Sequence, residues 1–416
     1  MRTPSRDVVV LAVGQALTST VVSLLTSVSS LSGAYLAPSP ALATVPVTAT
    51  VLGTLLMIYP ASTLMGRLGR RGGFMVKAAI GLLGGTVCFA SLAATSFAIL
   101  VTGAFLLGLF SAFGQYYRFA AIDAAPDPQD RAVAIAAVTG AGVVGGLAGP
   151  FLGGRFAGAV AGVPYGGAFV ALVLVCLWLA ASQMFLSADL GRDDGSAGSA
   201  APTARLGVGG DFIKASIICA VGFAVMTLTM NAAPLSIAHA GHGVQASATV
   251  LQVHFALMYL PSFANPFLLK RIGLRGLVAF GIAASGLGCV LTAAPAQTLA
   301  IYTLELGLSG IGWNFIFNGG TLLLAETYPA ALKTRAQGVN SLIVYCANAV
   351  ASFSAGALMA TLGWAAVNLA CLPLLALALL ALRPDDDLAR RPRNVVVPEP
   401  LLRARSANQS ETESRR

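Results

Sequence analysis

Long apolar stretches separated by short polar segments dominate the chain. Each stretch is rich in Ala, Gly, Leu and Val and reaches the length of about 20 residues that a helix needs to cross the hydrocarbon core. No stretch alternates apolar and polar positions as a barrel strand does. The pattern therefore predicts an all-α, polytopic membrane protein with twelve transmembrane helices. The predicted helices span about residues 8–36, 43–65, 74–94, 97–119, 132–154, 164–186, 212–233, 246–269, 276–294, 298–322, 336–360 and 362–382.

Composition favours lipid as the solvent. Only 10% of the residues are charged, whereas a soluble domain carries about 25%. A net charge of +9 would suggest nucleic acid as the partner of a soluble protein, but no basic patch interleaved with aromatic residues occurs. The six cysteines stand singly in apolar runs, without the spacing of a metal or haem site. We therefore expect a lipid bilayer as surroundings, and neither nucleic acid nor metal nor cofactor.

The positions of Lys and Arg predict the topology. With the N-terminus in the cytoplasm, nearly all basic loop residues fall on the cytoplasmic side, and Arg155 alone falls outside. The positive-inside rule requires this asymmetry, and an error of one helix would destroy it. Both termini are therefore expected in the cytoplasm. In this count Lys77 falls, with Arg67, Arg70 and Arg71, in or beside the loop after the second apolar run.

A constant offset of 204 positions relates the two halves of the chain. The offset joins loop charges as well as helix glycines, which indicates a parallel repeat with a pathway between the repeats. We expect six-helix halves at 1–186 and 211–383, a flexible cytoplasmic linker at 187–210 and a disordered cytoplasmic tail at 384–416. The matched pairs are Asp7 and Asp211, Arg67 and Arg271, Gly69 and Gly273, Gly84 and Gly288, Gly103 and Gly307, Gly108 and Gly312, and Arg131 and Arg335.

The loop at 62–71, Ser-Thr-Leu-Met-Gly-Arg-Leu-Gly-Arg-Arg, resembles the G-x-L-a-D-r-x-G-r-r signature of the major facilitator superfamily. Two positions depart from the signature, with Ser62 in place of the first Gly and Gly66 in place of the Asp. The resemblance covers about residues 7–383 and implies two six-helix halves and a secondary transporter. In the family this loop helps to stabilise the outward-facing state, and the missing Asp puts that role in doubt here.

The gating-loop candidates are Arg67, Gly69, Arg70 and Arg71, with Arg271 and Gly273 in a weaker second copy that has Lys270 in place of the Asp. The three arginines of the first copy either meet Asp123, Asp127 or Asp130 of the next cytoplasmic loop or serve only as topology signals.

A second resemblance lies in the fifth predicted helix, at 145–154, which looks like the family's G-x-x-x-G-P-x-x-G-G signature of efflux antiporters. Glycines allow helices to approach closely, and proline bends a helix. The residues concerned are Gly145, Gly149, Pro150, Gly153 and Gly154. Importers also have glycine-rich fifth helices, so import and export both stay open. The stretches 115–121 and 312–321 look like a bacterial branch that includes riboflavin importers.

Ionisable groups inside the bilayer are functional candidates, because burying them is costly. Glu305 is the one clear case within the predicted helices, about two turns from the outer end of the tenth. A carboxyl that takes up and releases a proton would suit a proton-coupled carrier, whereas a carboxylate near the headgroups would be structural. His254 is the only histidine in a predicted helix, and it either relays protons or packs through a hydrogen bond.

Amide and aromatic side chains supply the candidates for solute binding. They could bind a planar, hydrogen-bonding solute by stacking and by donor–acceptor contacts, or they could bond helices to one another. Prolines at 60, 261 and 266 either border a cavity or simply bend their helices. The candidates are Gln115, Tyr116, Tyr117, Trp313, Asn314, Asn318, Asn231 and Tyr345, with Gln15, Asn340 and Asn348 beside them.

The sequence thus predicts a multi-pass secondary transporter of the bacterial inner (plasma) membrane, proton-coupled and monomeric, for a small organic solute. The absence of a GxxxxGK[ST] loop argues against an ATP-driven pump. An enzyme is not expected, because His, Asp and Glu are scarce within the spans. The alternatives are a drug or metabolite efflux antiporter and, more remotely, a non-transporting membrane sensor.

Overall fold

The computed structural model of the chain describes residues 5–125, 128–188, 190, 209–292, 298–329 and 332–383. This part is helical and contains no strands, so the predicted all-α class is confirmed. Eight helical segments within it are long and apolar enough to cross a membrane. The predicted tail and most of the predicted linker lie outside the described residues.

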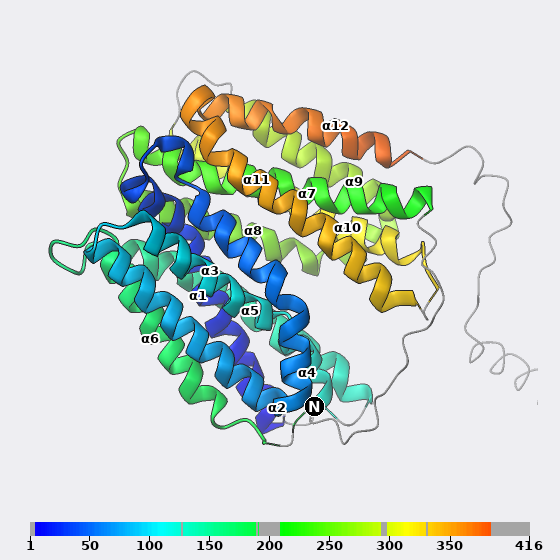
Figure 1. Cartoon of the computed structure of the whole chain (residues 1–416). Helices are drawn as coiled ribbons and strands as arrows, with labels where there is room; N and C mark the ends of the chain where they lie inside the picture. Colours follow the sequence, from blue (N-terminus) through cyan, green and yellow to red (C-terminus); the bar gives the residue numbers. More distant parts are fainter. Residues whose placement is uncertain are drawn as a thin grey trace, which may run out of the picture. The chain divides into compact units, whose positions relative to one another are not determined.

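The helices follow one another with few connecting residues (Figure 1). Two of them are short 3-10 helices, η1 (Pro40–Leu42) and η2 (Leu260–Phe263). The α-helices are α1 (Arg6–Leu36), α2 (Val45–Ala93), α3 (Phe97–Gly114), α4 (Tyr117–Asp123), α5 (Pro128–Phe156), α6 (Gly166–Gln183), α7 (Gly210–His239), α8 (Val244–Tyr259), α9 (Asn265–Leu291), α10 (Leu299–Ala325), α11 (Lys333–Leu369) and α12 (Cys371–Ala381).

Single glycines break three of the longer helices. In α2 the chain turns at Gly69 (φ 72°, ψ 174°), and in α9 it turns at Gly273 (φ 69°, ψ 177°). This region of backbone space is essentially open only to glycine. The two breaks lie 204 positions apart (273 − 69), which is the offset that relates the two halves in sequence. Residues matched by this offset therefore have the same backbone conformation here. Gly363 breaks α11 in a similar way (φ 76°).

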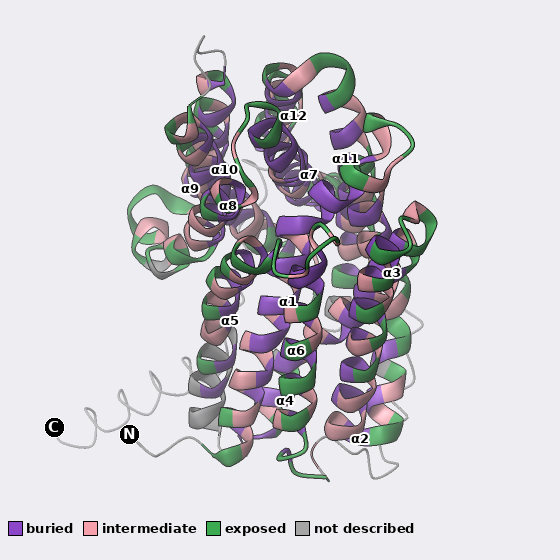
Figure 2. Cartoon of the chain, turned by 90° about the vertical axis from the view of Figure 1, so that its left-hand side faces the viewer, coloured by how far each residue is buried: buried purple, intermediate pink, exposed green. Residues whose placement is uncertain are grey.

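Buried apolar side chains form separate clusters before and after the linker. Two clusters consist of residues between 8 and 190, and three consist of residues between 212 and 382, which only Ala43 joins from the first part. The helices α1 and α7 are largely buried (Figure 2). Large apolar side chains such as Leu83, Trp178 and Val350 stay exposed on outer helix faces, as a lipid-facing surface allows.

Polar contacts join the two parts where the beginning of α2 packs on α11. Thr48 Oγ1 donates to Ser352 Oγ at 3.1 Å, and the Gly356 backbone N–H donates to Thr44 Oγ1 at 3.1 Å. Next to Gly69, the Arg70 backbone N–H donates to the Leu190 carbonyl at 2.9 Å, in the segment that follows α6.

Candidate functional site

A cavity of about 420 Å³ lies in the middle of the helices, lined by α1, α2, α3 and α5 on one side and by α7, α8 and α11 on the other. Its volume falls in the range of about 300–1,000 Å³ that is usual for small-molecule sites. No Asp, Glu, Lys or Arg occurs among the described residues that line it. A ligand in this cavity would therefore meet hydrogen-bonding and apolar side chains of the described lining, and no charged ones.

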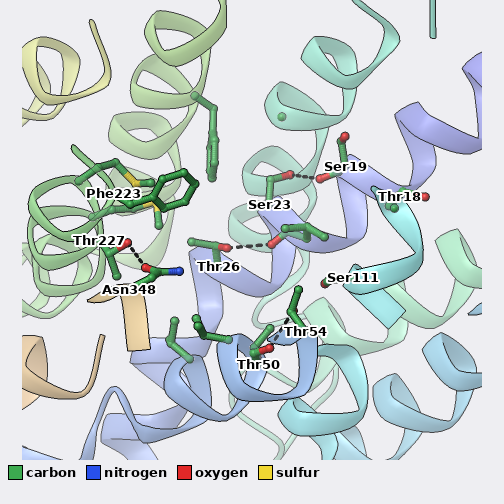
Figure 3. Close-up of a pocket in the computed structure, with 18 of the residues that line it drawn as sticks. Thr18, Ser19, Ser23, Thr26, Thr50, Thr54, Ser111, Phe223, Thr227 and Asn348 are labelled. Atoms are coloured by element: carbon green, nitrogen blue, oxygen red, sulfur yellow. Dashed lines mark hydrogen bonds between the residues drawn. The ribbon is translucent and has the colours of Figure 1, made fainter. Parts of the chain in front are cut away.

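Hydroxyl groups form the first wall of the cavity, which we call the hydroxyl wall (Figure 3). Most of these hydroxyls already donate to a carbonyl of their own helix, such as Ser23 to Ser19 at 2.7 Å and Thr26 to Val22 at 2.9 Å. Because the hydrogens are used, the lone pairs that remain make this wall an acceptor for donor groups. The wall consists of Thr18, Ser19, Ser23, Thr26, Thr50, Thr54 and Ser111.

Aromatic and methionine side chains form the opposite wall, which we call the aromatic wall. It consists of Phe223, Met226, Met230, Phe255, Tyr259 and Tyr345. Phe223 packs edge-on against Trp313 (centroids 5.4 Å apart) and Phe317 (4.8 Å), which are themselves stacked on each other. This backing fixes the Phe223 ring, and a fixed ring suits the stacking of a planar ligand.

Two amides lie at the edge of the aromatic wall. Asn348 accepts a hydrogen bond from Thr227, and Asn231 Nδ2 donates to Ser352 Oγ at 3.2 Å. Figure 3 places Thr227 and Asn348 across the cavity from Thr26 and Thr50. Each side-chain amide has more than one hydrogen-bonding site, so these contacts do not use all of the capacity of either group.

The glycines of α5 allow this helix to pack closely against α1, which carries part of the hydroxyl wall. A Cβ at Gly149 would lie 2.6 Å from the Thr20 carbonyl oxygen and 2.5 Å from the Leu24 backbone nitrogen of α1. The Gly145 carbonyl lies 2.8 Å from Ser23 Oγ, so the one hydroxyl hydrogen of Ser23 is shared between carbonyls of α1 and α5. On the far face of α5, a Cβ at Gly154 would meet the Ala248 side chain of α8 at 2.6 Å. Glycine thus allows α5 to contact helices of both parts.

Of the predicted solute residues, Gln115, Asn231 and Tyr345 line the cavity, and so do Gln15 and Asn348. The two tyrosines after Gln115 do not belong to the lining. Their side chains point into the helix packing: the Tyr116 hydroxyl donates to the Ile58 carbonyl at 2.6 Å, and the Tyr117 ring stacks on Phe74 at 4.1 Å.

The predicted residues of α10 also lie outside the lining. Asn314 Nδ2 donates to the Met258 carbonyl and to Ser262 Oγ, both at 2.6 Å. Met258 lies in the last turn of α8, just before η2 and its Pro261, where backbone carbonyls have no partner within the helix. Asn314 therefore satisfies a backbone carbonyl at a helix end. Trp313 lies behind Phe223, and Asn318 is half-buried away from the cavity.

Glu305 and His254 are both fully buried, outside the cavity lining. Among the described residues, neither carboxylate oxygen of Glu305 has a hydrogen-bond partner. His254 Nδ1 bonds the Leu306 carbonyl at 2.7 Å, while its Nε2 has no partner. Glu305 is therefore a buried ionisable group, as expected, but it lies within the helix packing.

Lys77 is a buried lysine, which the sequence interpretation counted among the charges in or beside a loop. It lies inside α2 with no exposed surface, and its Nζ donates to Thr18 Oγ1. The Nζ lies 4.6 Å from the centroid of the Phe110 ring and 4.5 Å from that of Tyr117. A sequence signal existed, since Lys77, Gly81 and Gly84 share one helix face and glycines mark a face that packs on other helices.

In the gating loop, Arg70 Nε pairs with Asp123 Oδ2 at 2.8 Å. This is one of the contacts that the sequence left open, while Asp127 lies outside the described residues. In the second copy, the Arg271 guanidinium lies over the Phe267 ring at 4.4 Å.

Comparisons with known proteins give relatives along nearly the whole chain. The riboflavin transporter RfnT of Brucella anthropi is 31% identical over 379 residues, which cover 91% of this chain and 95% of the relative. The uncharacterized MFS-type transporter YddS of Bacillus subtilis is 28% identical over 312 residues, or 71% of each chain. No protein-family model matches the chain.

Solved structures share the fold. An inward-facing, unoccupied bacterial homologue of the human lysosomal transporter Spinster has a TM-score of 0.71 at 16% identity, covering 91% of this chain and 96% of its own. The nucleoside transporter NupG has a TM-score of 0.69 at 14% identity, covering 89% and 98%.

Proposed function

The chain belongs to the major facilitator superfamily of membrane transporters, and from this premise we propose that it is a secondary active transporter that moves a small organic solute by alternating access. The cavity between α1–α6 and α7–α12 is the solute site in this proposal. The observation that carries it is the contrast between the hydroxyl wall and the aromatic wall.

We propose twelve spans in two six-helix halves, with both termini in the cytoplasm and the protein in the bacterial inner membrane as a monomer. The matching glycine breaks at Gly69 and Gly273 and the separate apolar cores support the repeat. In this orientation the contact between Thr48 and Ser352 closes the outer side of the cavity.

The solute in this proposal is a flavin-like compound, with a planar heterocyclic ring and a hydroxylated chain. The aromatic wall suits the ring by stacking, and the acceptor lone pairs of the hydroxyl wall suit the chain, whose hydroxyls donate. The absence of charged groups from the described lining suits an uncharged solute. The relative from Brucella anthropi is a riboflavin transporter, which agrees with this chemistry.

Riboflavin binding to the purified protein, followed by quenching of flavin fluorescence, tests the proposed substrate. Thr26→Val removes one hydroxyl of the wall at almost constant side-chain volume. We expect it to weaken riboflavin binding by about threefold to tenfold, which corresponds to the loss of one hydrogen bond. Lumichrome, which has the ring without the chain, is the control and should bind both proteins equally. Equal weakening of both ligands, or of neither, would reject the two-wall assignment.

We also propose that transport is proton-coupled, with Glu305 and His254 as candidate proton carriers in the second half. Glu305→Gln keeps the shape of the side chain and removes its proton exchange. A gradient of one pH unit can drive about tenfold accumulation per proton, and we expect the variant to lose this accumulation while it retains riboflavin exchange across proteoliposomes. Glu326→Gln, at the end of the same helix, is the control; unchanged accumulation in Glu305→Gln would remove Glu305 from the mechanism.

A drug or metabolite efflux antiporter is the second candidate function. In the glycine-rich segment of α5, Gly145, Gly149 and Gly153 pack against α1. This segment is as consistent with an exporter as with an importer. Direction of net flux under an imposed pH gradient separates the two.

A further inference from the structure

Lys77 has no role in the proposed solute site, yet its surroundings connect it to the cavity. Thr18 Oγ1, which accepts the hydrogen bond of the lysine, belongs to a residue that lines the cavity. Thr18 itself donates to the Gly14 carbonyl at 2.7 Å. Thr18 is therefore in contact with the Lys77 nitrogen and also lines the cavity.

The charge of Lys77 is not neutralised by a carboxylate. In the part of the chain that the structure describes, no carboxylate pairs with it. Its titratable neighbours there are Tyr117 of α4 and Cys176 of α6, while α1 and α3 present Thr18 and Phe110. The rings and the hydroxyl favour the ammonium form, and burial without a counter-charge favours the neutral amine. These two influences act in opposite directions on the protonation of Lys77, so neither the ammonium nor the amine form is favoured by all of its surroundings.

We propose that Lys77 is a proton-exchange site of the transporter, connected to the cavity through Thr18. The ammonium gives one proton to water in the cavity and becomes a neutral amine, and the reverse step restores it. A solute that hydrogen-bonds to Thr18 changes the partner of Lys77, so solute and proton binding affect one another, and this linkage is reciprocal. The inference rests on the proposed transport function, and it assigns a proton site to the first half, where the sequence suggested none.

Two substitutions separate proton exchange from a fixed charge. Arginine keeps the positive charge but does not release its proton, and glutamine has no charge at all. Lys77→Arg and Lys77→Gln should therefore both lose pH-driven riboflavin accumulation, from about tenfold per pH unit to near equilibrium, while riboflavin exchange continues. A fixed structural charge would instead let Lys77→Arg keep the accumulation, and that result would overturn the proposal.

A second measurement does not depend on the substrate. The chain has four lysines, so selective ¹³C labelling of lysine gives few Cε resonances, and Lys77→Arg identifies the one of Lys77. Across physiological pH, we expect this resonance to move between the ammonium and amine positions. A Lys77 resonance fixed at the ammonium position overturns the proposal, even if riboflavin is not the solute. If wild-type protein neither exchanges nor accumulates riboflavin while this resonance titrates, the substrate assignment fails and the proton site stands.

Discussion

A disulfide between Thr48→Cys and Ser352→Cys is expected to stop transport completely and reversibly. The two hydroxyl oxygens are 3.1 Å apart in the structure, and cysteines with side chains this close can form a disulfide. In the proposed cycle this contact must open for the cavity to reach the outer side. The bond would hold the two halves together at this point, so uptake should fall to that of empty liposomes.

The two single-cysteine variants and reduction of the disulfide are the controls for this experiment. Each single-cysteine variant should transport normally, and a reductant should restore transport by the cross-linked protein. Cys346, the exposed native cysteine among the described residues, is first replaced by Ser so that it does not react. Wild-type uptake by fully cross-linked protein would mean that the contact between α2 and α11 stays closed during transport.

Gly149→Val is expected to have the second large effect, on folding as well as on transport. A side chain at this position would meet backbone atoms of Thr20 and Leu24, which cannot move aside as a flexible side chain can. Inserting groups into a packed interface costs about 1–3 kcal/mol, and more where backbone must shift. We expect α1 to separate from α5, with a large loss of folded protein and at least a tenfold loss of transport.

Gly140→Val is the matched control on the same helix. A Cβ at Gly140 meets no atom of the described residues within 4 Å, so this substitution has the same effect on helix propensity without the clash. Yields of monodisperse protein and uptake rates are the measurements. Equal behaviour of the two variants would contradict a close approach of α1 and α5 at Gly149.

The sequence predicted the all-helical class, because lipid leaves few alternatives. Apolar runs of the required length must be helical in a bilayer. The turns at Gly69 and Gly273 fall where the sequence predicted loops, although the sequence interpretation did not identify these glycines as the breaks. The amides Gln115, Asn231 and Asn348 were identified because they are rare in apolar helices.

The rest of the site depends on how helices face one another, which one sequence does not specify. Asn314 looked like a ligand contact, but the break before Pro261 frees the Met258 carbonyl that it binds. The hydroxyl wall was overlooked, because serine and threonine are common in membrane helices and bond to their own backbone. A clue existed in Ser19, Ser23 and Thr26, whose spacing of four and three residues places them on one face of α1. Lys77 was overlooked because a count of charges in loops does not distinguish a lysine after a loop from one inside the packing.

Uptake of labelled riboflavin by proteoliposomes tests the central claim most directly, since it asks whether the two-walled cavity carries a flavin across a membrane. The account predicts uptake that saturates, that unlabelled riboflavin inhibits and that the disulfide between residues 48 and 352 abolishes. Uptake no greater than in empty liposomes, by protein shown to be folded and inserted, would contradict it.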